Sequence, residues 1–102
     1  MTQVNPKDIF LFSQKRTVLV RLPSFEWNFT PGARVWLQAN DQVVETRQIG
    51  TGNHEGRATI LLLPTGDWEL AQATLRMFMT SSNTVSVIEE AGATPATPPR
   101  KP

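Results

Sequence analysis

Short apolar runs, each ended by turn-forming residues, are the feature that most constrains how this chain folds. They are rich in Val, Ile, Leu and Phe, and Gly, Pro, Asn or Asp residues separate many of them. Such lengths and spacings are typical of antiparallel β-strands, whereas amphipathic helices need longer periodic stretches. The pattern predicts strands at residues 8–12, 17–22, 33–39, 43–49, 57–63 and 84–88.

Residues 33–49 carry the clearest hairpin pattern. Apolar and polar residues alternate, so Val35 and Leu37 share the inner face of a strand while Trp36 lies on the outer face. Asn40 and Asp41 suit the tight turn before the returning strand. The glycine-rich segment that follows, residues 50–56, is predicted to be a loop.

Residues 67–80 allow two interpretations. Asp67 is a suitable helix N-cap, and many good helix formers follow it. Against a helix, small and apolar residues occupy alternate positions. This alternation favours a strand at Ala71, Ala73, Leu75, Met77 and Met79.

The domain organisation follows from length and from a change in composition. A chain of 102 residues is expected to form one core. Residues 1–7 are predicted to be a polar N-terminal arm and residues 8–90 a β-sandwich domain. Residues 91–102 contain four prolines and no large apolar residue, which predicts an extended, flexible tail. The predicted fold class is therefore all-β, a single small antiparallel β-sandwich with a proline-rich C-terminal tail.

The middle of the chain resembles an immunoglobulin-like or prealbumin-like β-sandwich module. The resemblance covers about residues 31–70 and rests on a succession of strand, hairpin, glycine turn and strand, followed by a Pro-x-Gly step. The segments that carry it are Pro31-Gly-Ala-Arg-Val-Trp-Leu, Val43-Val44-Glu45-Thr46, Gly56-Arg-Ala-Thr-Ile and Leu63-Pro-Thr-Gly-Asp-Trp-Glu-Leu70. The cysteines of antibody domains are absent, because the chain has none.

Composition argues against several classes of partner. Ten Lys and Arg residues are nearly balanced by nine Asp and Glu residues and are scattered along the chain, so no basic field for nucleic acid is expected. No apolar run is long enough to span a membrane. Without cysteine there are no disulfides and no thiolate ligands for zinc. The N-terminus has no export-signal pattern, so we expect the protein to stay in the cytoplasm of the producing cell.

The sequence offers no catalytic, cofactor or metal site. His54 is the one histidine, and zinc normally needs three or four protein ligands. The glycine-rich loop around it lacks the Lys-Ser/Thr ending of a phosphate-binding loop. Paired carboxylates in a pocket are the one catalytic arrangement left open, but turns and outer faces account for most acidic residues. We therefore expect a protein that is not an enzyme.

Two groups of residues are candidates for binding or for an interface. Phe25, Trp27 and Phe29 alternate, and Trp36 is expected on an outer strand face, as in aromatic platforms for sugars or peptides. The run Ile60, Leu61, Leu62 and Leu63 is apolar on both faces of its strand, which suits cover by a second sheet or by another molecule.

These patterns predict a non-catalytic structural or assembly protein. Its expected partners are other protein subunits, either further copies of the chain in a homo-oligomer or capsid and tail proteins. Small accessory and decoration proteins of viruses and phages resemble such modules, so a capsid or tail accessory protein of a virion is the specific expectation. The alternative is a small binding module that recognises a glycan or a peptide through exposed aromatic residues.

Overall fold

The computed structural model describes residues 2–23 and 30–90, and in them the predicted antiparallel, mainly β domain is confirmed. Seven strands form one hydrogen-bonded sheet in the order β1-β7-β4-β5-β6-β3-β2. The elements are β1 (Thr2–Val4), the 3-10 helix η1 (Pro6–Asp8), β2 (Ile9–Phe12), β3 (Thr17–Arg21), β4 (Arg34–Ala39), β5 (Gln42–His54), β6 (Arg57–Pro64), α1 (Trp68–Thr80) and β7 (Val85–Glu89).

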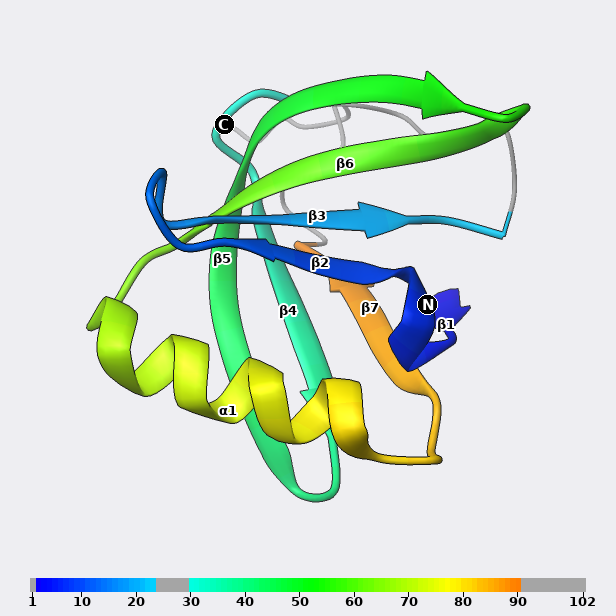
Figure 1. The fold of residues 1–102 in the computed structure, drawn as a ribbon. Helices are drawn as coiled ribbons and strands as arrows, with labels where there is room; N and C mark the ends of the chain where they lie inside the picture. Colours follow the sequence, from blue (N-terminus) through cyan, green and yellow to red (C-terminus); the bar gives the residue numbers. More distant parts are fainter. Residues whose placement is uncertain (1, 24–29, 91–102) are drawn as a thin grey trace, which may run out of the picture.

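The sheet is curled, so that its two halves face each other across the core (Figure 1). Strand β5 belongs to both halves: its first part pairs with β4 and its later part pairs with β6. A register shift between Gln48 and Gly50 marks the change of direction, as β-bulges commonly do. We call β2, β3 and β6 the first half, and β1, β7 and β4 the second half.

Helix α1 covers the open side of the curled sheet (Figure 1), and the prediction of a strand at residues 67–80 is wrong. Asp67 caps the helix by accepting a hydrogen bond from the Leu70 backbone nitrogen at 3.0 Å. The buried helix residues are Ala71, Leu75 and Phe78, a spacing of four and three that matches one helix face. Burial in this segment therefore follows the helical period, and the alternation of small and apolar residues in the sequence has no structural role.

Two further expectations are corrected by the backbone. The glycine-rich segment 50–56 is mostly strand, because β5 continues to His54 and only Glu55 and Gly56 form the turn, both with positive φ. Gly52 allows close packing within this strand, since a Cβ there would lie 3.2 Å from the Thr59 hydroxyl. Most of the expected N-terminal arm is part of the domain, since Thr2–Val4 pairs with β7 and Val4 is 3% exposed.

The predicted hairpin at 33–49 is confirmed. Asn40 and Asp41 make its turn with φ of 51° and 63°, the left-handed conformation that two-residue hairpin turns require. Residues 91–102 lie outside the described residues, as does the segment 24–29. No second, separate sheet is formed by the residues that the structure describes, because every strand belongs to the one order given above.

Candidate interaction surface

The outer face of the first half carries the most apolar exposed surface of the sheet. Strand alternation sends Ile9, Val18, Val20, Ile60 and Leu62 into the core, where each is at most 1% exposed. The intervening residues must then point outward, and in these strands most of them are also apolar. They are Phe10 and Phe12 of β2, Leu19 of β3, and Leu61 and Leu63 of β6.

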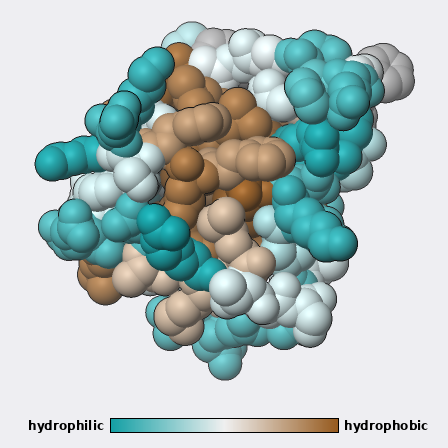
Figure 2. All heavy atoms as spheres, in the orientation of Figure 1, coloured by the Kyte–Doolittle hydropathy of each residue, from teal (hydrophilic) through white to brown (hydrophobic). Residues whose placement is uncertain are grey.

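Strand register brings these outward side chains together. Phe10 pairs with Leu19, and Leu19 pairs with Leu61, so one continuous row crosses three strands. Phe12 and Leu63 lie beside this row and are 45% and 41% exposed, while Phe10 is 39% exposed. We call these five residues the outer apolar face. Figure 2 shows hydrophobic side chains gathered at the centre of this side of the molecule, with hydrophilic residues around them.

Strand β5, which borders the outer apolar face beside β6, places glycines next to it. The residue paired with Leu61 is Gly50, and the residue paired with Thr59 is Gly52, so neither position adds a side chain above the sheet. Ile49, the extra residue of the bulge, is 46% exposed. Apolar side chains in this arrangement have no second layer over them among the described residues, which is typical of a surface that meets another molecule.

An ion-pair cluster closes one end of the outer apolar face. Asp8 accepts hydrogen bonds from Arg21 at 2.8 Å and from Arg57 at 2.9 Å, and its side chain is 11% exposed. Burial raises the pKa of Asp8, but the hydrogen bonds and positive charges of Arg57 and Arg21 outweigh it, so the pKa lies below the ordinary 3.8. Arg21 also lies over the ring of Phe10, 5.8 Å from its centroid. The cluster thus fixes Arg21 against the apolar face.

His54 lies beside this cluster and contacts Arg21. Its Nδ1 lies 3.3 Å from Arg21 Nη1, which always carries hydrogen, so Nδ1 is placed to accept. Glu55 adds a 3.4 Å contact to the same Arg21. Both side chains are well exposed. Among residues 2–23 and 30–90, no group of three or more His, Cys, Asp or Glu side chains is arranged to hold a metal ion.

The outer face of the second half is polar by comparison. Trp36 is partly exposed and pairs with Glu45 on one side and Ile88 on the other. Arg34 lies over the Trp36 ring at 5.8 Å from its centroid and donates from Nε to Glu90 at 2.7 Å. This hydrogen bond lowers the pKa of Glu90 and raises that of Arg34. Trp36 and Ile88 are therefore bordered by charged residues and do not form an apolar surface as extended as the outer apolar face.

A groove of about 310 Å³ lies between the start of β5 and the first turns of α1. Its apolar walls include Val43 and Leu70, which are 56% and 67% exposed. Two carboxylates also line it, the arrangement that an enzyme would need. Each already has a role in the fold: Asp67 caps α1, and Glu45 accepts a hydrogen bond from the Thr65 hydroxyl at 2.9 Å.

The structure divides the residues that the sequence singles out. Of the run at 60–63, Ile60 and Leu62 belong to the core, whereas Leu61 and Leu63 belong to the outer apolar face. The aromatic trio Phe25, Trp27 and Phe29 lies outside the described residues, so its part in a surface stays a prediction. Sequence reasoning missed Phe10, Phe12 and Leu19, although the unbroken apolar run of residues 9–12 carries the same signal as residues 60–63.

Comparisons with known protein families, with curated proteins and with solved structures find no match for this chain. In the part of the chain that is described, no helix is both long and apolar enough to cross a membrane.

Proposed function

We propose that this chain is a non-catalytic assembly protein that associates with other protein subunits through its outer apolar face. The observation that carries the proposal is the row of Phe10 and the partly exposed Leu19 and Leu61, flanked by the exposed Phe12 and Leu63, which no other element among the described residues covers. Contiguous apolar surface of this kind costs free energy in water and is stabilised when a partner covers it. The core does not need these side chains, because their strands already bury an inner set.

A more specific proposal is a capsid or tail accessory protein of a virus or phage. It is supported by the resemblance of residues 31–70 to immunoglobulin-like sandwich modules, with which a curled sheet of two facing halves is compatible. In that setting the protein is made in the cytoplasm and ordered onto a particle by its neighbours. Co-sedimentation with purified particles of a candidate virus tests this specific proposal, and failure to co-sediment with any of them contradicts it.

The mass of the purified protein, followed by light scattering across a concentration series, tests the general proposal. We expect a multimer whose population rises with concentration, because burial of the outer apolar face drives association. The double variant Leu61→Ser/Leu63→Ser should be monomeric over the same range. Ile88→Ser removes a partly exposed aliphatic side chain from the other half and serves as the matched control. A wild-type monomer throughout, or equal loss in the control, would contradict the proposal.

A second candidate function, recognition of a glycan or a peptide, is favoured by one observation. Trp36 is partly exposed, with Arg34 over its ring and Ile88 beside it, an arrangement that can stack on a sugar or proline ring. A change of tryptophan fluorescence on titration with oligosaccharides or proline-rich peptides, lost in Trp36→Phe, would support it. An unchanged spectrum across such a panel would argue against it.

A further inference from the structure

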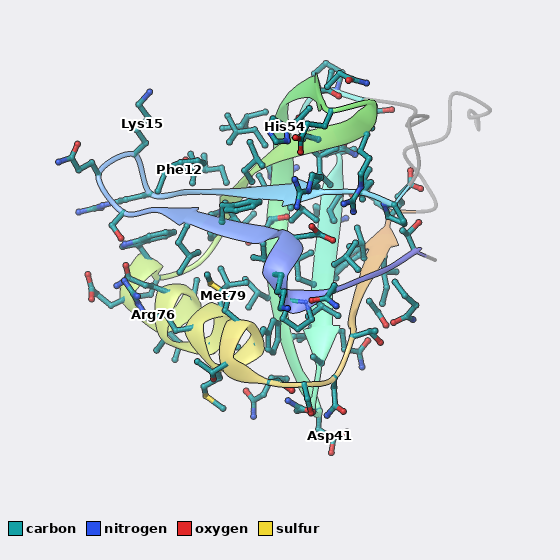
Figure 3. All side chains as sticks on the ribbon, turned by 45° about the vertical axis from the view of Figure 1, so that its right-hand side comes forward. Phe12, Lys15, Asp41, His54, Arg76 and Met79 are labelled. Atoms are coloured by element: carbon teal, nitrogen blue, oxygen red, sulfur yellow. The ribbon has the colours of Figure 1, made fainter. Side chains whose placement is uncertain are left out.

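The two exposed apolar sites of the domain differ in the charge around them. At the Phe12 end of the outer apolar face, the turn after β2 carries Lys15 and Arg16. Neither of these two cations forms an ion pair with any residue in 2–23 or 30–90. Figure 3 shows Lys15 and Phe12 at the same end of the β2–β3 hairpin. This end of the face is therefore apolar and basic.

The groove beside α1 has the opposite character. Val43 and Leu70 are its exposed apolar residues, and Glu45 and Asp67 are its charged ones. No basic residue is among those that line it. Its walls come from β5 and α1, whereas the outer apolar face belongs to β2, β3 and β6, so the two surfaces are separate sites on one molecule. The groove is therefore apolar and acidic.

These charges decide between modes of self-association. In a symmetric contact of two outer apolar faces, the unpaired charges at the contact are all of one sign, and like charges oppose association. In a head-to-tail contact, the basic end of one face meets the acidic groove of the next copy. Burial of apolar surface and attraction between opposite charges then both favour association. The volume of about 310 Å³ is at the lower limit of small-ligand sites, which suits a single aromatic side chain.

We propose that a second copy of this chain occupies the groove, with Phe12 of one copy inserted between Val43 and Leu70 of the next. Lys15 and Arg16 then lie close to Glu45 and Asp67. This inference rests on the proposed assembly function and gives it a geometry. Because each copy keeps a free face at one end and a free groove at the other, the contact is heterologous and repeats into a ring or an open filament.

Single substitutions on either side of the contact test this geometry by sedimentation velocity. Phe12→Ser removes the inserted side chain, and Leu70→Ser removes one wall of the groove. Each should weaken association by about tenfold or more, since an apolar side chain is no longer buried. Met77→Ser, which removes another exposed apolar side chain from the same helix but outside the groove, should leave the association unchanged. Circular dichroism of each variant checks that it is folded.

The sharpest result comes from mixing the two variants. Phe12→Ser keeps an intact groove and Leu70→Ser keeps an intact face, so an equimolar mixture regains one good contact and should form a dimer that grows no further. Raising the salt concentration should weaken wild-type association, because the charged rim is screened. The dimer in the mixture follows only from a contact between two different surfaces. Weakening by salt separates this contact from one between two like-charged faces, which salt would strengthen.

Other outcomes separate the two proposals. Association that survives Leu70→Ser but is lost in Phe12→Ser would indicate a symmetric contact between outer apolar faces, which overturns the head-to-tail geometry and leaves the assembly function standing. Association unaffected by both substitutions would overturn the geometry as well and place the contact elsewhere. A wild-type protein that is monomeric at every concentration would overturn both.

Discussion

The outer face of one half of the sheet is apolar and that of the other half is polar, although both halves bury an apolar inner face. In the first half the outward residues are Phe10, Leu19 and Leu61, with little polar surface between them. In the second half Trp36 and Ile88 are surrounded by charged partners such as Arg34 and Glu90. The inner faces are what the fold requires. The outward residues are free to differ, so the apolar half is where an interaction is expected.

The largest effect should come from comparing neighbouring residues of β6. Leu62→Ala leaves a cavity in the core and should lower the free energy of unfolding by about 2–5 kcal/mol. Leu63→Ala, one residue further and 41% exposed, should lower it by less than about 1 kcal/mol. Urea unfolding of both variants, measured at a concentration where the protein is monomeric, checks the difference. Equal losses would mean that the outer residue also belongs to the core.

A smaller effect is expected from the ion-pair cluster of the first half. Asp8→Asn removes the charge that Arg21 and Arg57 share and should cost about 1–3 kcal/mol of stability, as for hydrogen bonds to charged groups. The folded-state pKa of Asp8 is depressed, so its contribution is fully present above the unfolded value near 3.8. It is lost as the pH falls below that value through the folded pKa. A wild-type stability that does not fall more steeply than that of Asp8→Asn below pH of about 4 would contradict this account.

The smallest effect is expected at the corresponding pair in the second half. Arg34 and Glu90 form an exposed ion pair, and such pairs contribute little to stability. Arg34→Ala should therefore leave the urea midpoint almost unchanged. The substitution should nevertheless raise the pKa of the Glu90 carboxyl toward its ordinary value, since the hydrogen bond from Arg34 is what lowers it. An NMR titration of the side-chain carboxyl resonances measures this shift, and an unchanged Glu90 pKa would show that the pair is not formed in solution.

The sequence predicts the sheet better than it predicts the surface. Strands 17–22 and 33–39 follow directly from alternation, and strand 57–63 follows from a short apolar run that ends at Pro64. The turn at Asn40 and Asp41 follows from the residues that tolerate positive φ. The sequence of helix α1 is ambiguous, because small residues at alternate positions fit a strand as well as a helix. Only Asp67 and the spacing of Ala71, Leu75 and Phe78 distinguish the two. Local patterns do not resolve such a case; packing against the core does.

Two of the five residues of the outer apolar face, Leu61 and Leu63, could be predicted from the sequence. The run at residues 60–63 has no polar face, so one of its faces was expected to be covered. The order of strands in the sheet decides which other strands contribute to that face. Leu19 pairs with both Phe10 and Leu61, and a pairing between residues as far apart in the sequence as Leu19 and Leu61 cannot be predicted from local patterns. The groove beside α1 cannot be predicted from the sequence either, because it forms only where the helix and β5 lie side by side in the fold.

Hydroxyl-radical footprinting of the purified protein at low and at high concentration tests the central claim most directly, because it reports which side chains become covered. The account predicts that oxidation of Phe10, Phe12 and Leu63 falls as the concentration rises, and that it falls by more than oxidation of Trp36. Protection of Trp36 with the outer apolar face unchanged would contradict it and place the interaction surface on the other half of the sheet.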